Sequence, residues 1–579
     1  MFEVVVGIDF GSYGTGYAYS FNNPKNIELG KFKGQNTGIK VPTQIILDSE
    51  LKNILSFGAE CSQYQLKSND LYFKSIKMNI YHNLNYIKPE NNSKSFLLVD
   101  VITKVFEYIK LDAIKSIQQS RPSITEDQIK WIVTVPSIWN LHQRGIMISV
   151  CEKAGLFNKN TDRGNFLALE PEAASLYCSY DDSVDQKYLM PGKTYIVCDL
   201  GGGTGDIVTH FRTMGNQIIE KYLPIGGAYG SEEIDNKIFN DIIQKIFGFN
   251  DFNSLKDKFN YINYKQKDKP QNFEWDERSL YSLWHELQEN IKKNKMLTTN
   301  AMKDQSCIIN FSIFQDFTDG AQLKDLVNKW NNLCQEGWKI GVTSEKFWYL
   351  EFPYKIYFDI IENHASKIAE QISEICSHVN NIESILYVGG YCSTVIIINF
   401  LDNKFQNLKH LKPSCPERAV VKGAVLFGIN PYLINLRKAP YTIGFNCDDN
   451  WDESIHGGKG EKYYDEKFNI YKCRNSFHTL FRKGDDLSSK NNLIEQSFMT
   501  MNSRIIRLKF FKSKNENPVL WTENGVELIG DEQLDLKKDY PPDKRAFKLR
   551  LKFGGTYAIA SCIHEESGKE YSFPLYFNN

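Results

Sequence analysis

Residues 195–206 read Tyr-Ile-Val-Cys-Asp-Leu-Gly-Gly-Gly-Thr-Gly-Asp, an apolar run followed by a triple glycine between two aspartates. A short apolar run that ends in glycine favours a buried strand leading into a turn. Glycine can adopt a positive φ, and it lets the backbone approach an anion without an intervening Cβ. This stretch therefore predicts a strand that ends in a phosphate-binding turn.

A similar pattern lies about 190 residues earlier, where Ile8-Asp9-Phe10-Gly11 matches Cys198-Asp199-Leu200-Gly201. A third strand, residues 384–388, ends at Gly389 and Gly390. The repeated pattern suggests a duplicated unit. Helical patterns, such as residues 144–154 before Gly155, alternate with these strands and favour an α/β architecture.

The first glycine-rich turn belongs to neither of the two common nucleotide-binding motifs. The chain has no G-x-x-x-x-G-K-[ST] run, and residues 17–21 alternate like a strand instead of opening a helix after the glycines. We therefore expect a strand–turn–strand hairpin. An ordinary hairpin is the alternative for any single turn of this kind. Two matching turns with aspartates favour ATP chemistry, which needs close backbone N–H groups and carboxylates that hold Mg²⁺.

Length and composition limit the classes of function. A chain of 579 residues predicts several domains, and 69 Lys plus Arg against 70 Asp plus Glu give no global field for nucleic acid or anionic membrane. The absence of a long apolar run predicts no membrane span. Twelve cysteines without a CxxC pair favour reduced thiols and a cytoplasmic location. The ten histidines show no closely spaced metal pattern, so Mg²⁺ with nucleotide is the only metal expected.

The chain is expected to have three parts, with boundaries at residues 1–188, 189–435 and 436–579. From about residue 440 the sequence alternates aromatic or β-branched with polar residues, which predicts an all-β domain. Within it, residues 448–464 are rich in Asp, Gly and Lys and predict a long exposed loop.

The motifs, in their order along the chain, resemble those of the heat-shock 70-kDa chaperone superfamily, which has an actin-like (ribonuclease-H-like) two-lobe ATPase fold. The resemblance covers about residues 1–435, and it is strongest to the divergent heat shock 70 kDa protein 12 branch. The matching segments are Gly7-Ile8-Asp9-Phe10-Gly11, Val133-Thr134-Val135-Pro136, Glu170-Pro171-Glu172-Ala173-Ala174, residues 199–206 and Val388-Gly389-Gly390-Tyr391. Segments typical of the divergent branch are residues 16–21, 73–78 and 225–231.

The resemblance implies a role for each matching position. Asp9 and Asp199 would hold Mg²⁺ through water. Lys77 would face the γ-phosphate and the attacking water, with nearby Lys74 as the alternative, and Glu170 and Asp206 would complete the catalytic cluster. The implied nucleotide-binding residues are Gly11, Ser12, Tyr13, Gly201, Gly202, Gly203, Thr204, Gly226, Gly227, Gly389 and Gly390, together with Glu289, Lys292 and Lys293 on a predicted helix over residues 284–296. For those last three, a solvated charged helix face is the alternative.

By this resemblance the protein is expected to bind ATP or ADP with Mg²⁺, to hydrolyse ATP, and to act as a chaperone-like protein whose C-terminal β-domain engages client polypeptides. One departure concerns the segment before that domain, because Asn435-Leu436-Arg437-Lys438-Ala439-Pro440 replaces the acidic, leucine-rich linker of the chaperones. Two other functions stay open. One is a nucleotide-gated scaffold or sensor with little turnover, and the other is a sugar or acetate kinase.

Overall fold

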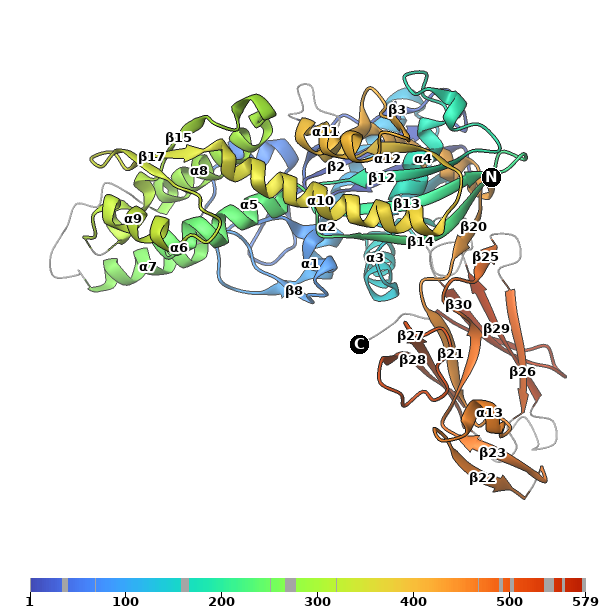
Figure 1. The fold of residues 1–579 in the computed structure, drawn as a ribbon. Coiled ribbons are helices and arrows are strands. Elements are labelled where there is room, and N and C mark those ends of the chain that lie inside the picture. Colours follow the sequence, from blue (N-terminus) through green and yellow to red (C-terminus); the bar gives the residue numbers. More distant parts are fainter. Residues whose placement is uncertain are drawn as a thin grey trace.

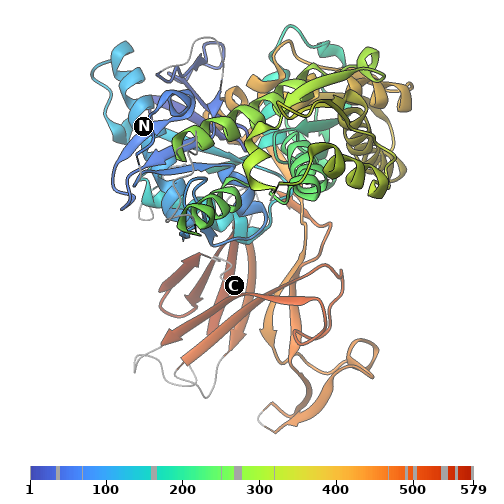
Figure 2. The same cartoon turned by 90° about the vertical axis from the view of Figure 1, so that its left-hand side faces the viewer.

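The computed structural model describes residues 2–33, 40–67, 69–157, 166–249, 251–265, 277–318, 320–466, 468–488, 493–499, 505–535, 546–553 and 558–574. Figures 1 and 2 show an elongated α/β part formed by the first three quarters of the chain and a β-rich C-terminal part that extends away from one end of it. The α/β architecture expected from the sequence is confirmed.

The first sheet carries the earlier of the two aspartate–glycine turns. Its strand order is β11-β10-β1-β2-β3, with β4 also paired to β2. β1 runs antiparallel to β2, with Asp9 opposite Gly16, and parallel to β10 on its other side. β1 and β2 thus form the expected hairpin. The bounds are β1 (Val4–Phe10), β2 (Gly14–Ser20), β3 (Glu28–Leu29), β4 (Val41–Pro42), β10 (Ile129–Val135) and β11 (Phe166–Leu169).

The second sheet repeats this arrangement around the later turn. Its strand order is β19-β18-β12-β13-β14-β20-β25, and β12 is antiparallel to β13 and parallel to β18. In both sheets the strand that ends in the aspartate–glycine turn therefore lies between a hairpin partner and a parallel strand. The bounds are β12 (Thr194–Leu200), β13 (Gly205–Arg212), β14 (Ile218–Gly227), β18 (Ile382–Val388), β19 (Lys409–Leu411), β20 (Ile434–Lys438) and β25 (Asp486–Ser488).

Two helices, α4 (Glu170–Cys178) and α12 (Ala419–Ile429), pack against each other and contact both sheets. Their backbones come unusually close, because a Cβ added to Gly423 of α12 would lie 1.7 Å from the carbonyl oxygen of Ala173. A Cβ on Gly7 of β1 would likewise lie 2.8 Å from the Cβ of Ala424. Only glycine fits at either contact, so these positions draw α12 against both α4 and the first sheet.

The other face of the first sheet is covered by α2 (Leu98–Ser120) and α3 (Leu141–Lys153), with α1 (Ile76–Tyr81) alongside. α3 ends as expected, with Gly155 at φ 72° just beyond it. Smaller strands complete this part: β5 (Gln44–Leu47), β6 (Ile54–Phe57), β7 (Leu71–Lys74), β8 (Tyr86–Ile87) and β9 (Phe96–Leu97).

A helical region inserted after β14 forms the far end of the α/β part (Figure 1). Its core contains four tryptophans, Trp284, Trp330, Trp338 and Trp348, each at most 5% exposed. All four therefore pack in the core of this region. The elements of this region are α5 (Glu232–Ile238), α6 (Gln244–Phe247), α7 (Phe252–Lys265), α8 (Glu277–Leu297), β15 (Ser306–Asn310), α9 (Leu323–Leu333), β16 (Gly341–Ser344) and β17 (Tyr349–Pro353). From there α10 (Tyr354–His378) runs back along the second sheet to β18, and α11 (Val395–Lys404) follows β18.

The C-terminal part is built almost entirely of strands, as expected. One sheet has the order β24-β21-β27-β28 and another β26-β29-β30-β31, and β22 pairs with β23. Phe445, Phe510 and Phe547 are buried in its core. The bounds are β21 (Thr442–Cys447), β22 (Glu461–Asp465), β23 (Ile470–Arg474), β24 (Ser476–Phe481), β26 (Leu493–Met499), β27 (Ile505–Ser513), β28 (Val526–Asp535), β29 (Ala546–Phe553), β30 (Ala558–His564) and β31 (Glu570–Pro574).

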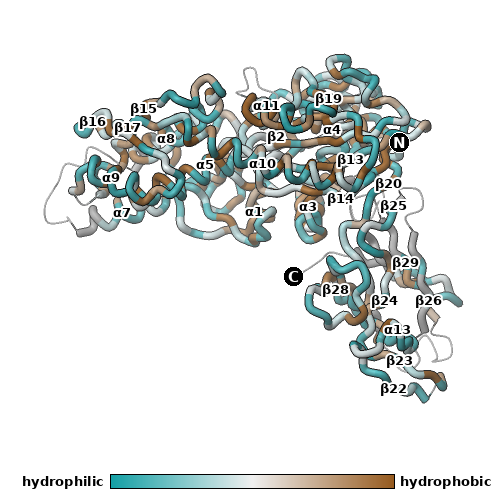
Figure 3. The backbone as a smooth tube through the Cα atoms, in the orientation of Figure 1, coloured by the Kyte–Doolittle hydropathy of each residue, from teal (hydrophilic) through white to brown (hydrophobic). Residues whose placement is uncertain are grey.

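One expectation for this part is wrong. Residues 448–464 do not form one long exposed loop, because they contain the short helix α13 (Glu453–His456) and most of β22. His456 of α13 is buried, and the centroid of its imidazole ring lies 5.5 Å from that of the Trp451 indole ring. Figure 3 shows that the tip around β22 and β23 is mostly hydrophilic, whereas hydrophobic segments concentrate in the central strands and helices of the α/β part. Within the described helices, none combines the length and the apolar character that crossing a membrane requires.

Candidate functional site

The two glycine-rich turns lie directly against each other. A Cβ added to Gly202 would lie 2.7 Å from the Cβ of Tyr13, and one added to Gly203 would lie 2.4 Å from Ser12 Oγ and 2.2 Å from Met78 Sδ. Real Cβ atoms essentially never come this close to another heavy atom. Glycine at these positions therefore lets the turn after β12 meet the turn after β1.

The second turn is held in shape by its own backbone and by the chain before α5. The Gly201 N–H donates to the Thr204 carbonyl at 2.9 Å, which closes the turn. The carbonyls of residues 201–203 accept hydrogen bonds from the N–H groups of residues 230–232 at 2.8–3.3 Å. On the first turn, the Thr43 hydroxyl donates to the Gly11 carbonyl at 2.6 Å. Both turns are thus held in place by hydrogen bonds to their backbone carbonyl groups.

Four buried carboxylates lie beneath the turns, and they are the four that the resemblance implied: Asp9, Glu170, Asp199 and Asp206. Asp199 lies opposite Asp206 in the β12–β13 ladder, and Glu170 begins α4 directly after β11. Lys77 Nζ lies 2.5 Å from Glu170 Oε1, and Lys40 forms an ion pair with Asp9. Four carboxylates and two ammonium groups leave this cluster with a net charge of −2 when all are ionised.

Burial opposes this ionisation. It raises the pKa of Asp199 well above its ordinary value, and the neighbouring carboxylates raise it further. It also raises the pKa of Glu170 to about 7, although Lys77 acts in the opposite direction. The pKa of Asp206 is raised by burial too, against hydrogen bonds from the Ser137 hydroxyl at 2.7 Å and the Ile138 N–H at 3.0 Å. A bound cation would reverse these shifts.

One carboxylate oxygen of the cluster is buried without compensation. Asp199 Oδ2 has no hydrogen-bond partner among the described residues. Such an atom costs free energy unless a cation or an ordered water satisfies it. The donor set here consists of hard carboxylate oxygens, which is the chemistry that Mg²⁺ prefers. Asp199 therefore fits the role of holding Mg²⁺ through water, whereas the Asp9 carboxylate already forms an ion pair with Lys40.

The third glycine turn reaches the same cluster from the end of β18. Gly389 has φ 84°, and a Cβ there would lie 2.6 Å from Asp199 Oδ1 and 2.4 Å from the Leu200 carbonyl oxygen. Glycine is required here for both conformation and space. Around Gly390 the space is open, with no atom within 4 Å of an added Cβ.

Gly226 and Gly227 lie in β14, opposite Asp206 and Gly205 of β13. The strand end that carries them therefore borders the carboxylate cluster.

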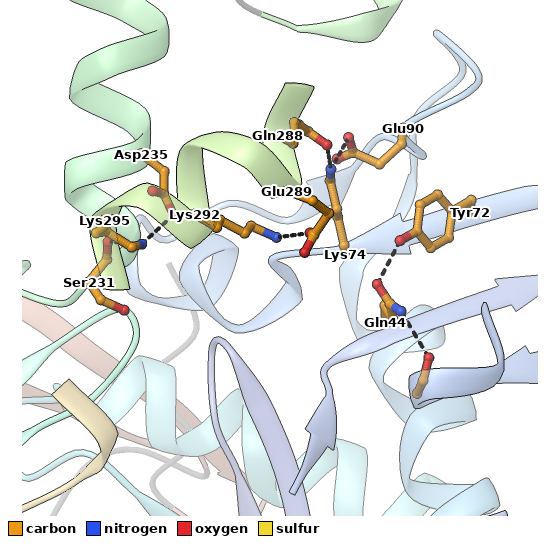
Figure 4. A network of polar contacts seen from close by, with 11 residues as sticks. Gln44, Tyr72, Lys74, Glu90, Ser231, Asp235, Gln288, Glu289, Lys292 and Lys295 are labelled. Carbon is orange, nitrogen blue, oxygen red and sulfur yellow. Dashed lines mark hydrogen bonds and ion pairs between the residues drawn. The ribbon is translucent and has the colours of Figure 1, made fainter. Parts of the chain in front are cut away.

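Helix α8 lies above the first turn, and its polar side chains reach in two directions (Figure 4). Lys292 pairs with Glu289 at 3.0 Å, and its Nζ lies 5.8 Å from the centroid of the Tyr13 ring. Glu289 and Lys293 are exposed and Lys292 is half-buried, so only Lys292 of these three residues packs toward the first turn. The buried lysine of this helix is Lys295, which bonds Asp235 at 2.6 Å and the Ser231 carbonyl at 2.7 Å.

The structure places Lys77 and its alternative Lys74 in different surroundings. Lys74 lies at the end of β7, where its Nζ bonds Gln288 at 2.7 Å and Glu90 at 3.0 Å (Figure 4). Lys77, 4% exposed, is instead the lysine beside Glu170, with the Trp139 ring 5.5 Å from its Nζ. Of these two lysines, only Lys77 belongs to the carboxylate cluster. Lys40 and Lys295 were missed because no sequence motif marks an isolated lysine whose partner lies on another element.

A second buried charge cluster lies two residues further along α4. Arg437 of β20 makes two hydrogen bonds of 2.6 Å to the two carboxylate oxygens of Glu172. The Lys438 N–H donates to Glu220 of β14 at 2.6 Å. The segment that replaces the chaperone linker is therefore a strand of the second sheet, tied to the helix that carries Glu170.

No protein-family model matches the chain. Curated relatives match over its whole length: heat shock 70 kDa protein 12A of Homo sapiens and of Mus musculus are each 24% identical over 654 residues, covering 100% of this chain and 92% of theirs. Heat shock 70 kDa protein 12B of Homo sapiens is 22% identical over 638 residues, and the match covers 96% of this chain and 88% of the length of protein 12B. The resemblance to the heat-shock 70-kDa superfamily is thus confirmed. Within it, the similarity is to the divergent branch of proteins 12A and 12B.

Proposed function

We propose that this protein binds ATP with Mg²⁺ between two duplicated, actin-like lobes and hydrolyses it. The observation that carries the proposal is the meeting of two aspartate–glycine turns, from equivalent strands of two similar sheets, at a buried cluster of four carboxylates. Backbone N–H groups at glycine turns suit phosphate, and an uncompensated carboxylate cluster suits a divalent cation.

The duplication is supported by the shared strand arrangement. β1 and β12 occupy equivalent places, each between an antiparallel hairpin partner and a parallel strand, and each ends in an aspartate followed by a glycine turn. We assign residues 1–188 to the first lobe and residues 189–435 to the second. The nucleotide would lie where the two sets of strand ends meet.

Each residue of the cluster then has a defined task. Asp9 and Asp199 bind the water ligands of Mg²⁺, which when bound supplies positive charge next to the phosphates. Lys77, oriented by Glu170, places its ammonium beside the γ-phosphate and the attacking water, and Asp206 completes the polar shell around that water. The Thr204 hydroxyl and the N–H groups of residues 11–13, 202 and 203 hold the phosphate oxygens, and Gly201 shapes the turn through its own hydrogen bond to Thr204.

The rest of the nucleotide is assigned to the surrounding elements. Gly226, Gly227, Gly389 and Gly390 line it because they border Asp199 and Asp206 with little or no side-chain bulk. Glu289, Lys292 and Lys293 of α8 flank the adenosine, with Lys292 already beside Tyr13.

The chaperone-like role is assigned to residues 436–579. The similarity to heat shock 70 kDa proteins 12A and 12B extends into this region, because the matches cover 96–100% of the whole chain. We propose that the β-rich part engages client polypeptides. Among the described residues, the β-rich part pairs with a strand of the lobes only where β20 pairs with β14. Because β20 also pairs with β25, strands of the β-rich part and of the proposed nucleotide site belong to one sheet.

A second candidate function is a nucleotide-gated scaffold with little turnover. It is favoured by the ion pair between Lys40 and Asp9, because an internal cation already compensates one of the two carboxylates assigned to the metal. Mg²⁺ would have to compete with that ammonium group for Asp9. The same lobes would then report nucleotide binding to the β-rich part without fast hydrolysis.

Single-turnover ATP hydrolysis with Mg²⁺ tests the proposal on the wild type, Asp199→Ala, Lys77→Ala and the matched control Lys74→Ala. We expect Asp199→Ala and Lys77→Ala to lose at least about 100-fold in rate, and Lys74→Ala to stay near wild type because it lies outside the cluster. Nucleotide binding without turnover in the wild type would favour the scaffold. Absence of nucleotide binding would refute both functions, and phosphate transfer to a sugar or acetate would indicate a kinase.

A further inference from the structure

The C-terminal β-rich part contains a cavity of about 1400 Å³ on the side of β21 and β24. Its wall includes aromatic rings, such as those of Trp451 and Phe468, together with groups that can ligate metals. Three of these groups come together: Cys447, Asp449 and His478 each offer one ligand atom, and the three atoms lie within 4.8 Å of one another.

The sheet ladder explains why they meet. β21 pairs with β24 so that Phe445 is opposite His478 and Cys447 is opposite Ser476. Side chains two residues apart on a strand share a face, so Cys447 and His478 are diagonal neighbours on one face of the sheet. Asp449 follows two residues after Cys447, where the chain has left the strand.

Asp449 is positioned by its backbone as well as by its side chain. Its carbonyl accepts a hydrogen bond from the Cys473 N–H at 2.8 Å, and its N–H donates to Ser476 Oγ at 3.4 Å. Its Oδ1 lies 2.8 Å from His478 Nδ1. The carboxylate is thus held against the imidazole by a loop that is itself tied to two neighbouring strands.

Neighbouring groups of similar chemistry are engaged elsewhere. The Asp448 carboxylate accepts hydrogen bonds from the Tyr463 hydroxyl at 2.9 Å and the Asn475 N–H at 3.1 Å. The ring nitrogen Nδ1 of His456 accepts from the Asp452 N–H at 2.9 Å. Among the described residues, the ligand atoms that come together here are thus those of one thiol, one carboxylate and one imidazole.

This set suits a divalent transition ion of the Zn²⁺ class. Four-coordinate zinc takes sulfur, nitrogen and oxygen ligands at about 2.0–2.3 Å. The three ligand atoms of Cys447, Asp449 and His478 need to approach one another by only about 1 Å to bind one such ion. A thiolate ligand disfavours Mg²⁺ and Ca²⁺, which prefer oxygen. With Cys447 and Asp449 ionised and His478 neutral, the three ligands carry a charge of −2 that such an ion neutralises.

We propose that Cys447, Asp449 and His478 form a binding site for a Zn²⁺-class ion, with a fourth coordination position open to the cavity. All three residues line that cavity, so the fourth ligand is a water or a donor atom of a molecule bound there. Three protein ligands and one exchangeable position are the arrangement of zinc sites that bind a substrate or partner group. The site lies in the β-rich part and does not depend on nucleotide.

Titration of the full-length chain with Co²⁺ tests this proposal, because a thiolate–cobalt bond gives a charge-transfer band that a carboxylate site lacks. We expect one equivalent to bind with that band. Cys447→Ser should abolish the band, and His478→Gln should weaken affinity at least about tenfold. The matched controls Cys376→Ser, an exposed cysteine on α10, and Asp448→Asn should keep both.

A second measurement locates the ion independently of absorbance. Zn²⁺ should protect the Cys447 thiol, but not that of Cys376, from alkylation mapped by mass spectrometry. Circular dichroism checks that each variant is folded. The proposal is overturned if Cys447→Ser keeps the band, or if neither Co²⁺ nor Zn²⁺ binds the folded wild type at micromolar concentration.

Discussion

Removing the Arg437 guanidinium should destabilise the protein strongly, because it leaves the Glu172 carboxylate buried without its partner. The Glu172 side chain is 3% exposed and that of Arg437 13%, and two hydrogen bonds of 2.6 Å join them. Breaking a buried pair of this kind from one side costs about 3–5 kcal/mol. Since the half-buried Arg144 also interacts with Glu172, we expect Arg437→Met to lie near the lower end, at about 3 kcal/mol.

A double-mutant cycle measured by urea unfolding isolates this pair. Arg437→Met and Glu172→Gln should each destabilise, whereas the double variant should lose clearly less than their sum because no charge stays unpaired. Lys438→Met is the control, since Lys438 pairs with the half-exposed Asp486 and should change stability by at most about 1 kcal/mol. Additive losses in the double variant, or a loss below about 1 kcal/mol for Arg437→Met, would refute the reasoning.

Three further predictions concern other buried groups. Burial raises the pKa of Glu220 to about 8, so this carboxyl group should lower stability as pH rises from about 4.5 to 8. Glu220→Gln should therefore lose less stability than the wild type between pH 5 and pH 8 in urea unfolding, while the buried Glu170 and Asp199 keep their own share of the loss. Gly389→Ala should weaken ATP binding at least about tenfold by calorimetry, because its methyl group would strike Asp199, whereas Gly145→Ala, which has open space, should not. Trp284→Ala should cost about 3–5 kcal/mol by thermal unfolding, and a cost below 1 kcal/mol would contradict its place in the core.

The strands around the aspartate–glycine turns could be predicted because their signal is local. Residues 4–10 and 194–200 are apolar runs that end in glycine, and both are strands within one residue of the expected bounds. The hairpin of residues 14–20 could likewise be inferred from its alternation. Such signals depend on neighbours in sequence, and tertiary packing did not override them here.

The pairings between distant elements could not be predicted in the same way. Glu172 and Arg437 are 265 residues apart, and neither lies in a pattern that marks a partner. Lys40 has no motif around it, yet it pairs with Asp9. Cys447 and His478 lie on two strands that are adjacent in the sheet but 31 residues apart in sequence, because the β22–β23 hairpin is inserted between them. A spacing of this kind matches no metal-binding motif. The composition of residues 448–464 predicts a loop because Asp, Gly and Lys are common in loops, but composition does not show that α13 and β22 form there.

The short ladder of β20 also gives the molecule a mechanical weak point. β20 pairs with β14 at Ile218–Ile434 and Ile219–Leu436, and on its other side with β25 through three residues. When the ends of the chain are pulled apart, these few hydrogen bonds and the Arg437–Glu172 contact bear the load between the α/β part and the β-rich part. The long ladders of β12–β13 and β27–β28 spread the same load over many more bonds. Under tension the two parts should therefore separate at β20 before either one unravels.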